Sequence, residues 1–156
     1  MKTRAGVAVA GTLAAVIVGT SAGTAEASTL QSRALSWASA QKNDRYQYGA
    51  AGPSRFDCSG LTSYSYKKAG KSIPRTAQGQ YNKAKKLNRK SLRRGDLVFI
   101  GTSSKRIYHV GVFAGYWSGK DWMWNANTGS YRGRKVVLAP TNEYTKGSPR
   151  AYYGRF

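Results

Sequence analysis

The stretch FDCSGLTSYSYKKAG at residues 56–70 predicts a helix that begins at the only cysteine of the chain. Asp57 stands at the N-cap position, where a carboxylate can accept hydrogen bonds from the first backbone N–H groups, and Gly70 stands where helices commonly end. Cys58 is then the first helical residue, among N–H groups that have no partner in the helix and near the positive end of its dipole. We expect this position to lower the pKa of the thiol from its free value of about 8.5.

Helical spacing of apolar residues predicts two further helices, one on each side of this stretch. The first spans residues 29–41, with Ser28 or Thr29 as its cap, and the second spans residues 75–85. Residues 43–57 are rich in turn-forming residues, and we predict a loop there.

The second half of the chain changes to short apolar and aromatic runs, which are typical of strands. Ser118-Gly119-Lys120-Asp121 supplies a hairpin turn between two of them. The predicted strands span residues 97–100, 108–116, 121–126, 135–139 and 150–156. Because helices come first and strands second, the sequence predicts an α+β fold with an antiparallel sheet.

The first 27 residues are typical of a secretory signal peptide. Lys2 and Arg4 precede an apolar, alanine-rich run, and Ala25-Glu26-Ala27 offers small residues for cleavage after Ala27. The run is short for a membrane span, although a retained N-terminal anchor is the alternative. We therefore expect one secreted domain, residues 28–156, with no transmembrane segment.

The charge balance indicates a polyanionic partner or environment. The chain carries 26 basic and 6 acidic residues, a net charge of +20. Nucleic acid, anionic lipid and the bacterial wall could all attract such a protein. The export signal favours wall polymers, and we expect no dedicated nucleic-acid binding. Much of the charge lies between Lys83 and Arg94, and a solvated loop face is the alternative explanation of that run.

The chain has a single cysteine, Cys58, and a single histidine, His109. A lone thiol in an exported protein implies intermolecular pairing, an inert buried position or a reactive group. A nucleophilic thiol needs a base that can also protonate the leaving amine, and histidine usually fills that role. The two residues stand on a helix start and on a strand, so the sequence predicts a catalytic pair.

A catalytic histidine usually needs a polar group that orients its ring. Asn125 and Asn127 both fall on the strand predicted to pair with the histidine strand. We favour Asn125, which shares a face with Met123, and leave Asn127 as the alternative. No second histidine or clustered carboxylate is present, so we expect no metal or cofactor.

Several separate motifs resemble the NlpC family of bacterial cell-wall peptidases. They are FDCSGLTSYSYKKAGKSIPRTAQGQ (56–80), RRGDLVFI (93–100), HVGVFAGY (109–116) and the approach YQYGAAGPSRFDC (46–58). The resemblance covers most of the chain from residue 30 onward. It implies a papain-like fold, with N-terminal helices packed on a C-terminal antiparallel sheet or small barrel.

The resemblance also implies roles for individual residues. Cys58 matches the nucleophile, His109 the base and Asn125 the third polar residue of the family's triad. Two positions depart from the family pattern: Ala50 replaces a glycine of the approach motif, and Ala77 replaces a serine. The interval between the histidine and the asparagine is also a few residues longer than usual.

Three more residues match positions around the substrate in this family. Tyr46 matches a tyrosine whose hydroxyl lies beside the nucleophile. Asp57 and Ser59 match positions that hold the free amine of the stem peptide. The implied activity is a secreted, monomeric cysteine endopeptidase that cuts peptidoglycan stems between γ-D-glutamate and diaminopimelate or lysine.

Two alternatives remain open at this point. The same fold and catalytic pair could perform amidase, transpeptidase or acyltransferase chemistry, or serve as an antibacterial toxin. The cationic and aromatic composition could also suit a binder of wall polymers or other polyanions that performs no catalysis.

Overall fold

A computed structural model describes residues 28–129 and 131–156 of the chain. The predicted signal peptide, residues 1–27, lies outside the described residues. Within the described residues, no helix has the length and apolar character needed to cross a membrane.

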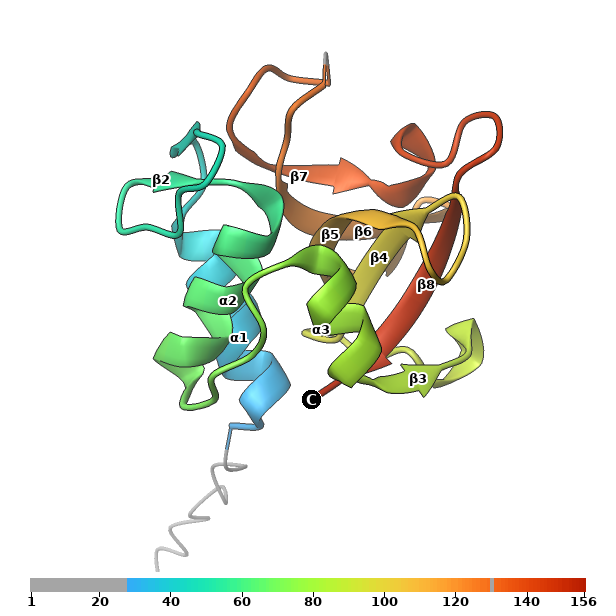
Figure 1. The fold of residues 1–156 in the computed structure, drawn as a ribbon, viewed down its shortest axis with the longest axis horizontal. Coiled ribbons are helices and arrows are strands. Elements are labelled where there is room, and N and C mark those ends of the chain that lie inside the picture. The colour runs from blue at the N-terminus through green and yellow to red at the C-terminus, as the bar shows by residue number, and fades with distance from the viewer. Residues whose placement is uncertain (1–27, 130) are drawn as a thin grey trace, which may run out of the picture.

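Three helices lie on one side of the molecule, and they confirm the sequence prediction (Figure 1). The helix α1 spans Leu30–Ala40, α2 spans Cys58–Ala69 and α3 spans Ala77–Lys83. A side-chain oxygen caps each of them, from Thr29, Asp57 and Thr76 in turn. Gly70 ends α2 in the left-handed conformation that glycine adopts without steric cost.

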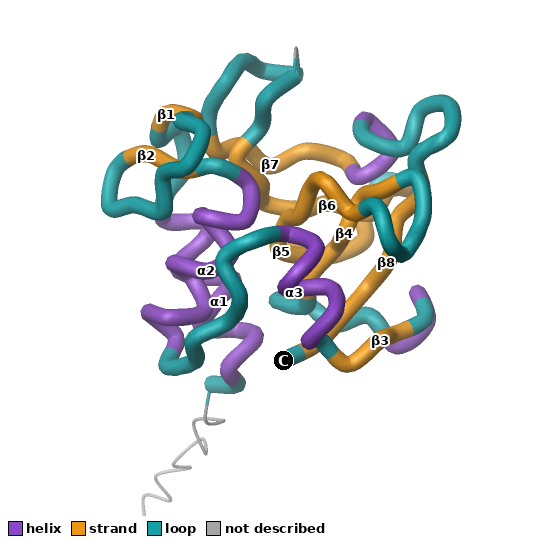
Figure 2. The backbone as a smooth tube through the Cα atoms, viewed as in Figure 1, coloured by secondary structure: helices purple, strands orange, loops and turns teal. Residues whose placement is uncertain are grey.

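Six strands form one antiparallel sheet in the order β3-β8-β4-β5-β6-β7. They span Lys85–Leu87 (β3), Leu97–Gly101 (β4), Ile107–Trp117 (β5), Lys120–Ala126 (β6), Val136–Pro140 (β7) and Arg150–Arg155 (β8). The five predicted strands are confirmed as β4 to β8. The fold is therefore α+β, with the helices against an antiparallel sheet (Figure 2).

Three short strands were missed by the sequence prediction. The strand β3 lies inside the basic run and pairs with the C-terminal strand β8. Two-residue strands, Arg45–Tyr46 (β1) and Arg55–Phe56 (β2), pair in parallel within the segment predicted as a loop. Pairs this short leave almost no alternation of apolar and polar residues from which to recognise a strand.

The sheet has an apolar core on each face. On the helix side, Val110 and Val112 of β5 pack with Ala34 and Ala38 of α1. On the other side, Phe113 packs in a second cluster with Val98, Ile100 and Met123. Strand alternation places His109 on the same side as Phe113, and Asn125 on the same side as Met123. His109 and Asn125 therefore stand on two neighbouring strands and share one face of the sheet.

Candidate active site

The first turn of α2 brings the Cys58 sulfur against strand β5. The Sγ atom lies 3.9 Å from the carbonyl oxygen of Tyr108, to which the thiol donates. The backbone N–H of Val110 donates to the same sulfur. The thiol thus touches the backbone on both sides of His109, and its side chain is only partly exposed.

The environment of Cys58 favours the protonated thiol. Burial is the largest influence and raises the pKa of Cys58, and the nearby carboxylate of Asp57 raises it further. The backbone N–H groups of Val110 and Ser59, together with Arg75, act in the opposite direction but do not outweigh the first two. The expectation of a lowered pKa is not met, because desolvation and Asp57 exceed what the helix start supplies.

His109 is buried and bonded to Asn125 across the sheet. The distance from His109 Nε2 to Asn125 Oδ1 is 3.0 Å. The amide of Asn125 is itself oriented, since its Nδ2 donates to the carbonyl of Val137 on β7 at 3.4 Å. With the amide oxygen turned toward the ring, Nε2 must carry the hydrogen, and Nδ1 keeps a lone pair.

Burial also decides the charge of the imidazole. Burial lowers the pKa of His109 to about 4, because its effect outweighs that of the hydrogen bond to Asn125, which raises the pKa. Near neutral pH the ring is uncharged and can accept a proton. The resting pair is therefore a neutral thiol and a neutral imidazole.

Tyr144 completes the histidine environment, and the sequence analysis did not identify it. Its ring stacks on the His109 ring, with centroids 4.8 Å apart and an interplanar angle of 18°. Its hydroxyl lies 2.9 Å from Asn125 Oδ1 and 3.0 Å from Asn127 Oδ1. Tyr144 follows the turn after β7, about 35 residues from the histidine, so no local motif connects the two.

Asn127 has a different role from Asn125. Its Nδ2 donates to the carbonyl oxygens of Gly129, Tyr131 and Gly133. These bonds hold the loop that follows β6. Of the two asparagines left open by the sequence, Asn125 is the one that contacts the imidazole.

Asp57 and Ser59 are held by a guanidinium that the sequence analysis did not place in the site. Arg75 donates to both carboxylate oxygens of Asp57, at 2.9 and 2.7 Å, and to the Ser59 hydroxyl at 2.9 Å. Asp57 also accepts from the N–H groups of Gly60 and Gly49. Burial alone would raise the pKa of Asp57, but Arg75 and these N–H groups hold it below its ordinary value.

Tyr46 lies beside the first turn of α2, which carries Cys58. The strands β1 and β2 pair with Tyr46 opposite Phe56, which places the tyrosine beside the start of α2. Burial raises the pKa of Tyr46, and the neighbouring Cys58 and Asp57 raise it further. The guanidinium of Arg134 lies over its ring at 5.2 Å. Tyr46 therefore keeps its hydroxyl proton and can donate it at the site.

This arrangement suits acyl transfer. It joins a thiol, a neutral base, an amide that fixes the base and unpaired N–H groups at a helix start. Over residues 28–129 and 131–156, no group of three or more metal-ligating side chains occurs.

Comparisons with known proteins agree with this architecture. The sequence model of the NlpC/P60 family matches residues 43–147, which is more than half of the chain. The bifunctional muramidase/DL-endopeptidase CwlT of Bacillus subtilis is 47% identical over 73 residues, which are 45% of this chain and 22% of that protein. The chain thus corresponds to a small part of this curated relative.

Solved structures show the same fold. The P60 domain of an antigen from M. avium subspecies paratuberculosis superposes with a TM-score of 0.65 at 27% identity, covering 81% of this chain and 93% of that one. RipD of Mycobacterium tuberculosis, described as a non-catalytic NlpC/p60 domain protein adapted to peptidoglycan binding, gives a TM-score of 0.65 at 21% identity, covering 83% and 98%. The fold is papain-like, and the chain belongs to the NlpC/P60 family.

Proposed function

We propose that this protein is a secreted cysteine endopeptidase that hydrolyses peptide bonds in peptidoglycan stems. The observation that supports the proposal is the contact of the Cys58 sulfur with the strand that carries His109, together with the bond between that histidine and Asn125. The Cys58 sulfur lies against the backbone that flanks His109, and the His109 ring is fixed by Asn125 at 3.0 Å. The DL-endopeptidase named among the relatives supports the choice of substrate.

The reaction begins from the neutral pair. His109 Nδ1 takes the thiol proton as the sulfur attacks the carbonyl carbon of the stem peptide. The new charge on His109 is stabilised through its Nε2–H bond to Asn125. His109 then gives its proton to the leaving amine, and the acyl group remains on Cys58. Water, activated by His109, releases the acyl group and restores the thiol.

Two groups would receive the oxyanion. The N–H of Cys58 lies in the first turn of α2, where backbone N–H groups have no acceptor within the helix. The Tyr46 hydroxyl keeps its proton, because burial and the neighbouring Cys58 and Asp57 raise its pKa. Together they would stabilise the tetrahedral intermediate, whose negative oxygen develops only during the reaction.

The proposed substrate bond joins γ-D-glutamate to diaminopimelate or lysine, and Asp57 with Ser59 would receive the free amine of the stem. In the resting structure Arg75 neutralises Asp57 and occupies both side chains. An incoming ammonium would therefore share the Asp57 and Ser59 oxygens with Arg75, or bind to those oxygens from the exposed side of this hydrogen-bond network.

Mass spectrometry of digested muropeptides tests the proposal. The native protein should release fragments that end in γ-D-glutamate, together with fragments that begin with a free diaminopimelate or lysine amine. Cys58→Ser should abolish these products, whereas Ser63→Ala on the same helix should leave them unchanged. Fragments cut at the glycan–peptide junction would indicate an amidase, and exchanged acyl groups without new free ends would indicate an acyltransferase.

A non-catalytic wall binder is the second candidate, because RipD shares the fold and is described as non-catalytic. The net charge of +20 would favour adsorption to an anionic wall without any turnover. A Cys58→Ala protein separates the two. Loss of products with retained wall binding supports the peptidase, and an unchanged biological effect supports the binder.

A further inference from the structure

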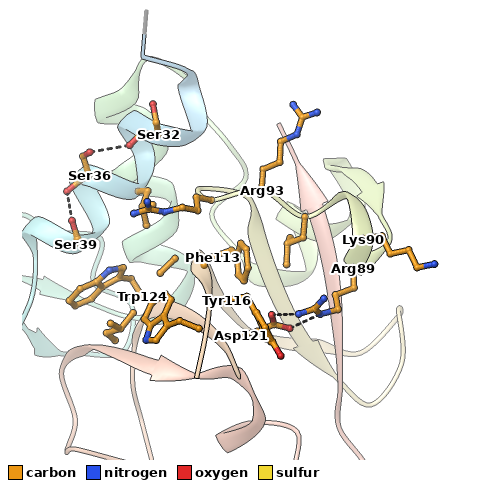
Figure 3. Close-up of a pocket in the computed structure, with 17 residues that line it drawn as sticks. Ser32, Ser36, Ser39, Arg89, Lys90, Arg93, Phe113, Tyr116, Asp121 and Trp124 are labelled. Carbon is orange, nitrogen blue, oxygen red and sulfur yellow. Dashed lines mark hydrogen bonds and ion pairs between the residues drawn. The ribbon is translucent and has the colours of Figure 1, made fainter. Parts of the chain in front are cut away.

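A second hollow lies at the far end of β5 from the catalytic pair. It is a groove of about 1120 Å³ between α1, the basic segment before β4 and the β5–β6 hairpin (Figure 3). His109 is near the beginning of β5 and Trp117 is its last residue. At the usual rise of a strand, about 25 Å separates them. The lining also reaches Phe113 and Trp124, but Cys58, His109 and Asn125 do not belong to it.

The rim of the groove carries four cations, three of which have no acidic partner among the described residues. Arg89, Lys90, Arg93 and Arg94 all line it, and all four are exposed. The one acid in the lining, Asp121, is held by Arg89 through both oxygens, at 3.0 and 2.7 Å. The other three cations make no ion pair in the described parts of the chain.

One side of the groove offers a rigid indole. Trp117 and Trp122 stack in parallel, with centroids 5.1 Å apart and an interplanar angle of 3°. The Trp122 Nε1–H donates to the Trp117 carbonyl oxygen at 3.1 Å and fixes the pair. Trp117 stays 40% exposed. Gly115 leaves room for this ring, since a Cβ there would lie 3.1 Å from it.

The opposite side is a row of hydroxyl groups on α1. Ser32, Ser36 and Ser39 face the groove in Figure 3, across from Arg93. Each hydroxyl donates its hydrogen to a carbonyl oxygen of the helix region. Their oxygens are left as acceptors, and acceptors are what hydroxyl-rich ligands require.

We propose that this groove binds an anionic sugar polymer of the cell wall and holds the enzyme on its substrate. The exposed guanidinium groups match phosphate or carboxylate groups, and Arg forms paired hydrogen bonds with both. The flat indole provides an apolar face for a sugar ring, and the serine oxygens accept from sugar hydroxyls. The assignment to a wall polymer rests on the proposed function, whereas the groove and its charge do not.

The lining fits a sugar polymer better than a nucleic-acid strand. Single strands are bound by a succession of aromatic platforms, one for each stacked base. Here the lining offers two exposed aromatic rings, Trp117 and Tyr116, and the guanidinium of Arg89 already lies over the Tyr116 ring at 5.0 Å. Two such rings are too few to stack a succession of bases.

The test measures binding and hydrolysis separately in two matched pairs of variants. Arg93→Gln/Arg94→Gln removes two charges from the groove, and Lys67→Gln/Lys71→Gln removes two exposed charges elsewhere. Binding to purified walls is measured in a Cys58→Ala background, so that turnover cannot change the ligand. Hydrolysis of a short soluble stem peptide is measured with Cys58 intact.

We expect the arginine pair to lose wall affinity about tenfold, with the lysine pair within about twofold of the parent. Both pairs should hydrolyse the soluble peptide normally. If the proposed function is wrong, no variant will hydrolyse this peptide, whereas the binding assay can still show whether the groove holds the wall. Trp117→Leu should weaken binding too, with its fold checked by thermal unfolding.

The ligand source is resolved by comparing intact walls, walls stripped of phosphate polymers and a purified phosphate-containing wall polymer. Loss of binding on stripping assigns the groove to the phosphate polymer, and retention assigns it to the carboxylates of peptidoglycan. Equal losses in the arginine and lysine pairs would overturn the proposal. So would an oligonucleotide that binds as tightly as the walls and with the same dependence on Arg93 and Arg94.

Discussion

At the residue scale, one amide determines which nitrogen of His109 can act as the base. The Val137 carbonyl fixes the amide of Asn125, and the amide oxygen fixes the hydrogen on Nε2. The Tyr144 hydroxyl approaches the same oxygen, and the Tyr144 ring covers the imidazole. The lone pair on Nδ1 therefore follows from contacts on β6, on β7 and in the turn after β7.

The neutral resting pair predicts the pH dependence of the reaction. Because the pKa of His109 is lowered to about 4, the imidazole stays able to accept a proton until the pH falls to that value. For a soluble stem peptide, kcat/KM should be level from neutrality to about pH 5 and then fall about tenfold per unit below about pH 4. An acid limb near the ordinary histidine pKa would contradict this assignment.

Thiol alkylation provides an independent check on Cys58. Since burial and Asp57 raise the pKa of the thiol, labelling by iodoacetamide should rise with pH at a midpoint above that of a free cysteine. A midpoint below the free value would show instead that the sulfur and the imidazole form an ion pair before substrate binds.

Tyr144→Phe should lower kcat about fivefold and leave KM nearly unchanged. The change removes one hydroxyl near Asn125 and keeps the ring on His109, and a buried hydrogen bond contributes about 1 kcal/mol. The acid limb of kcat/KM should also shift, because the amide that holds the imidazole loses a partner. Tyr153→Phe, on the same side of the sheet, is the control and should change neither quantity.

At the element scale, the start of α2 is fixed by the loop packed against it. A Cβ on Gly60 would lie 2.0 Å from the backbone oxygen of Ala50, a clash that no side-chain rotation can relieve. The backbone N–H of Asp57 donates a hydrogen bond to the same Ala50 oxygen. The position of Cys58, the proposed nucleophile, thus depends on a close approach of two backbones.

Gly60→Ala should therefore reduce the free energy of unfolding by about 3 kcal/mol, which urea titration would measure. It should also raise the rate of Cys58 alkylation relative to the native protein, because displacing the loop exposes the start of α2. Ser63→Ala, one turn further along α2, should cost less than about 0.5 kcal/mol. Equal stability of the two variants would mean that the loop adapts without loss.

The elements that carry strong local signals were predictable from sequence, and those made by distant contacts were not. Capping residues and periodicity predicted α1, α2 and the strands from β4 onward. In the short pair β1 and β2, each residue pairs with one ten positions away, so the local sequence gives no signal. The same holds for the site. Asn125 lies on the strand that pairs with the histidine strand, whereas Tyr144 and Arg75 reach their partners only through the tertiary fold.

At the scale of the whole molecule, acidic groups are used within the fold and basic groups are left at the surface. Four carboxylates form ion pairs in the described residues, and the buried one, Asp96, binds Arg155 through both oxygens. That pair ties the C-terminal strand β8 to the turn before β4. With a net charge of +20, the exposed surface is dominated by unpaired cations.

The buried histidine should make the stability of the whole fold depend on pH in two separate windows. In the folded protein the pKa of His109 is lowered from 6.5 to about 4, so the unfolded chain takes up a proton first as the pH falls. Stability should decline by about 3 kcal/mol between these two values. Asp57, whose pKa is held below its ordinary value, should add a further loss at more acidic pH.

Urea unfolding of the native protein and of His109→Gln over this pH range separates the windows. The glutamine variant starts from a lower stability but has no group that titrates between 6.5 and about 4, so its curve should be flat there and should fall only where the carboxylates protonate. Repulsion among the surface cations acts on both proteins alike, and the difference between the curves therefore isolates the imidazole. Parallel curves would mean that His109 is able to bind a proton in the folded state at its ordinary pKa, which its burial beneath Tyr144 forbids.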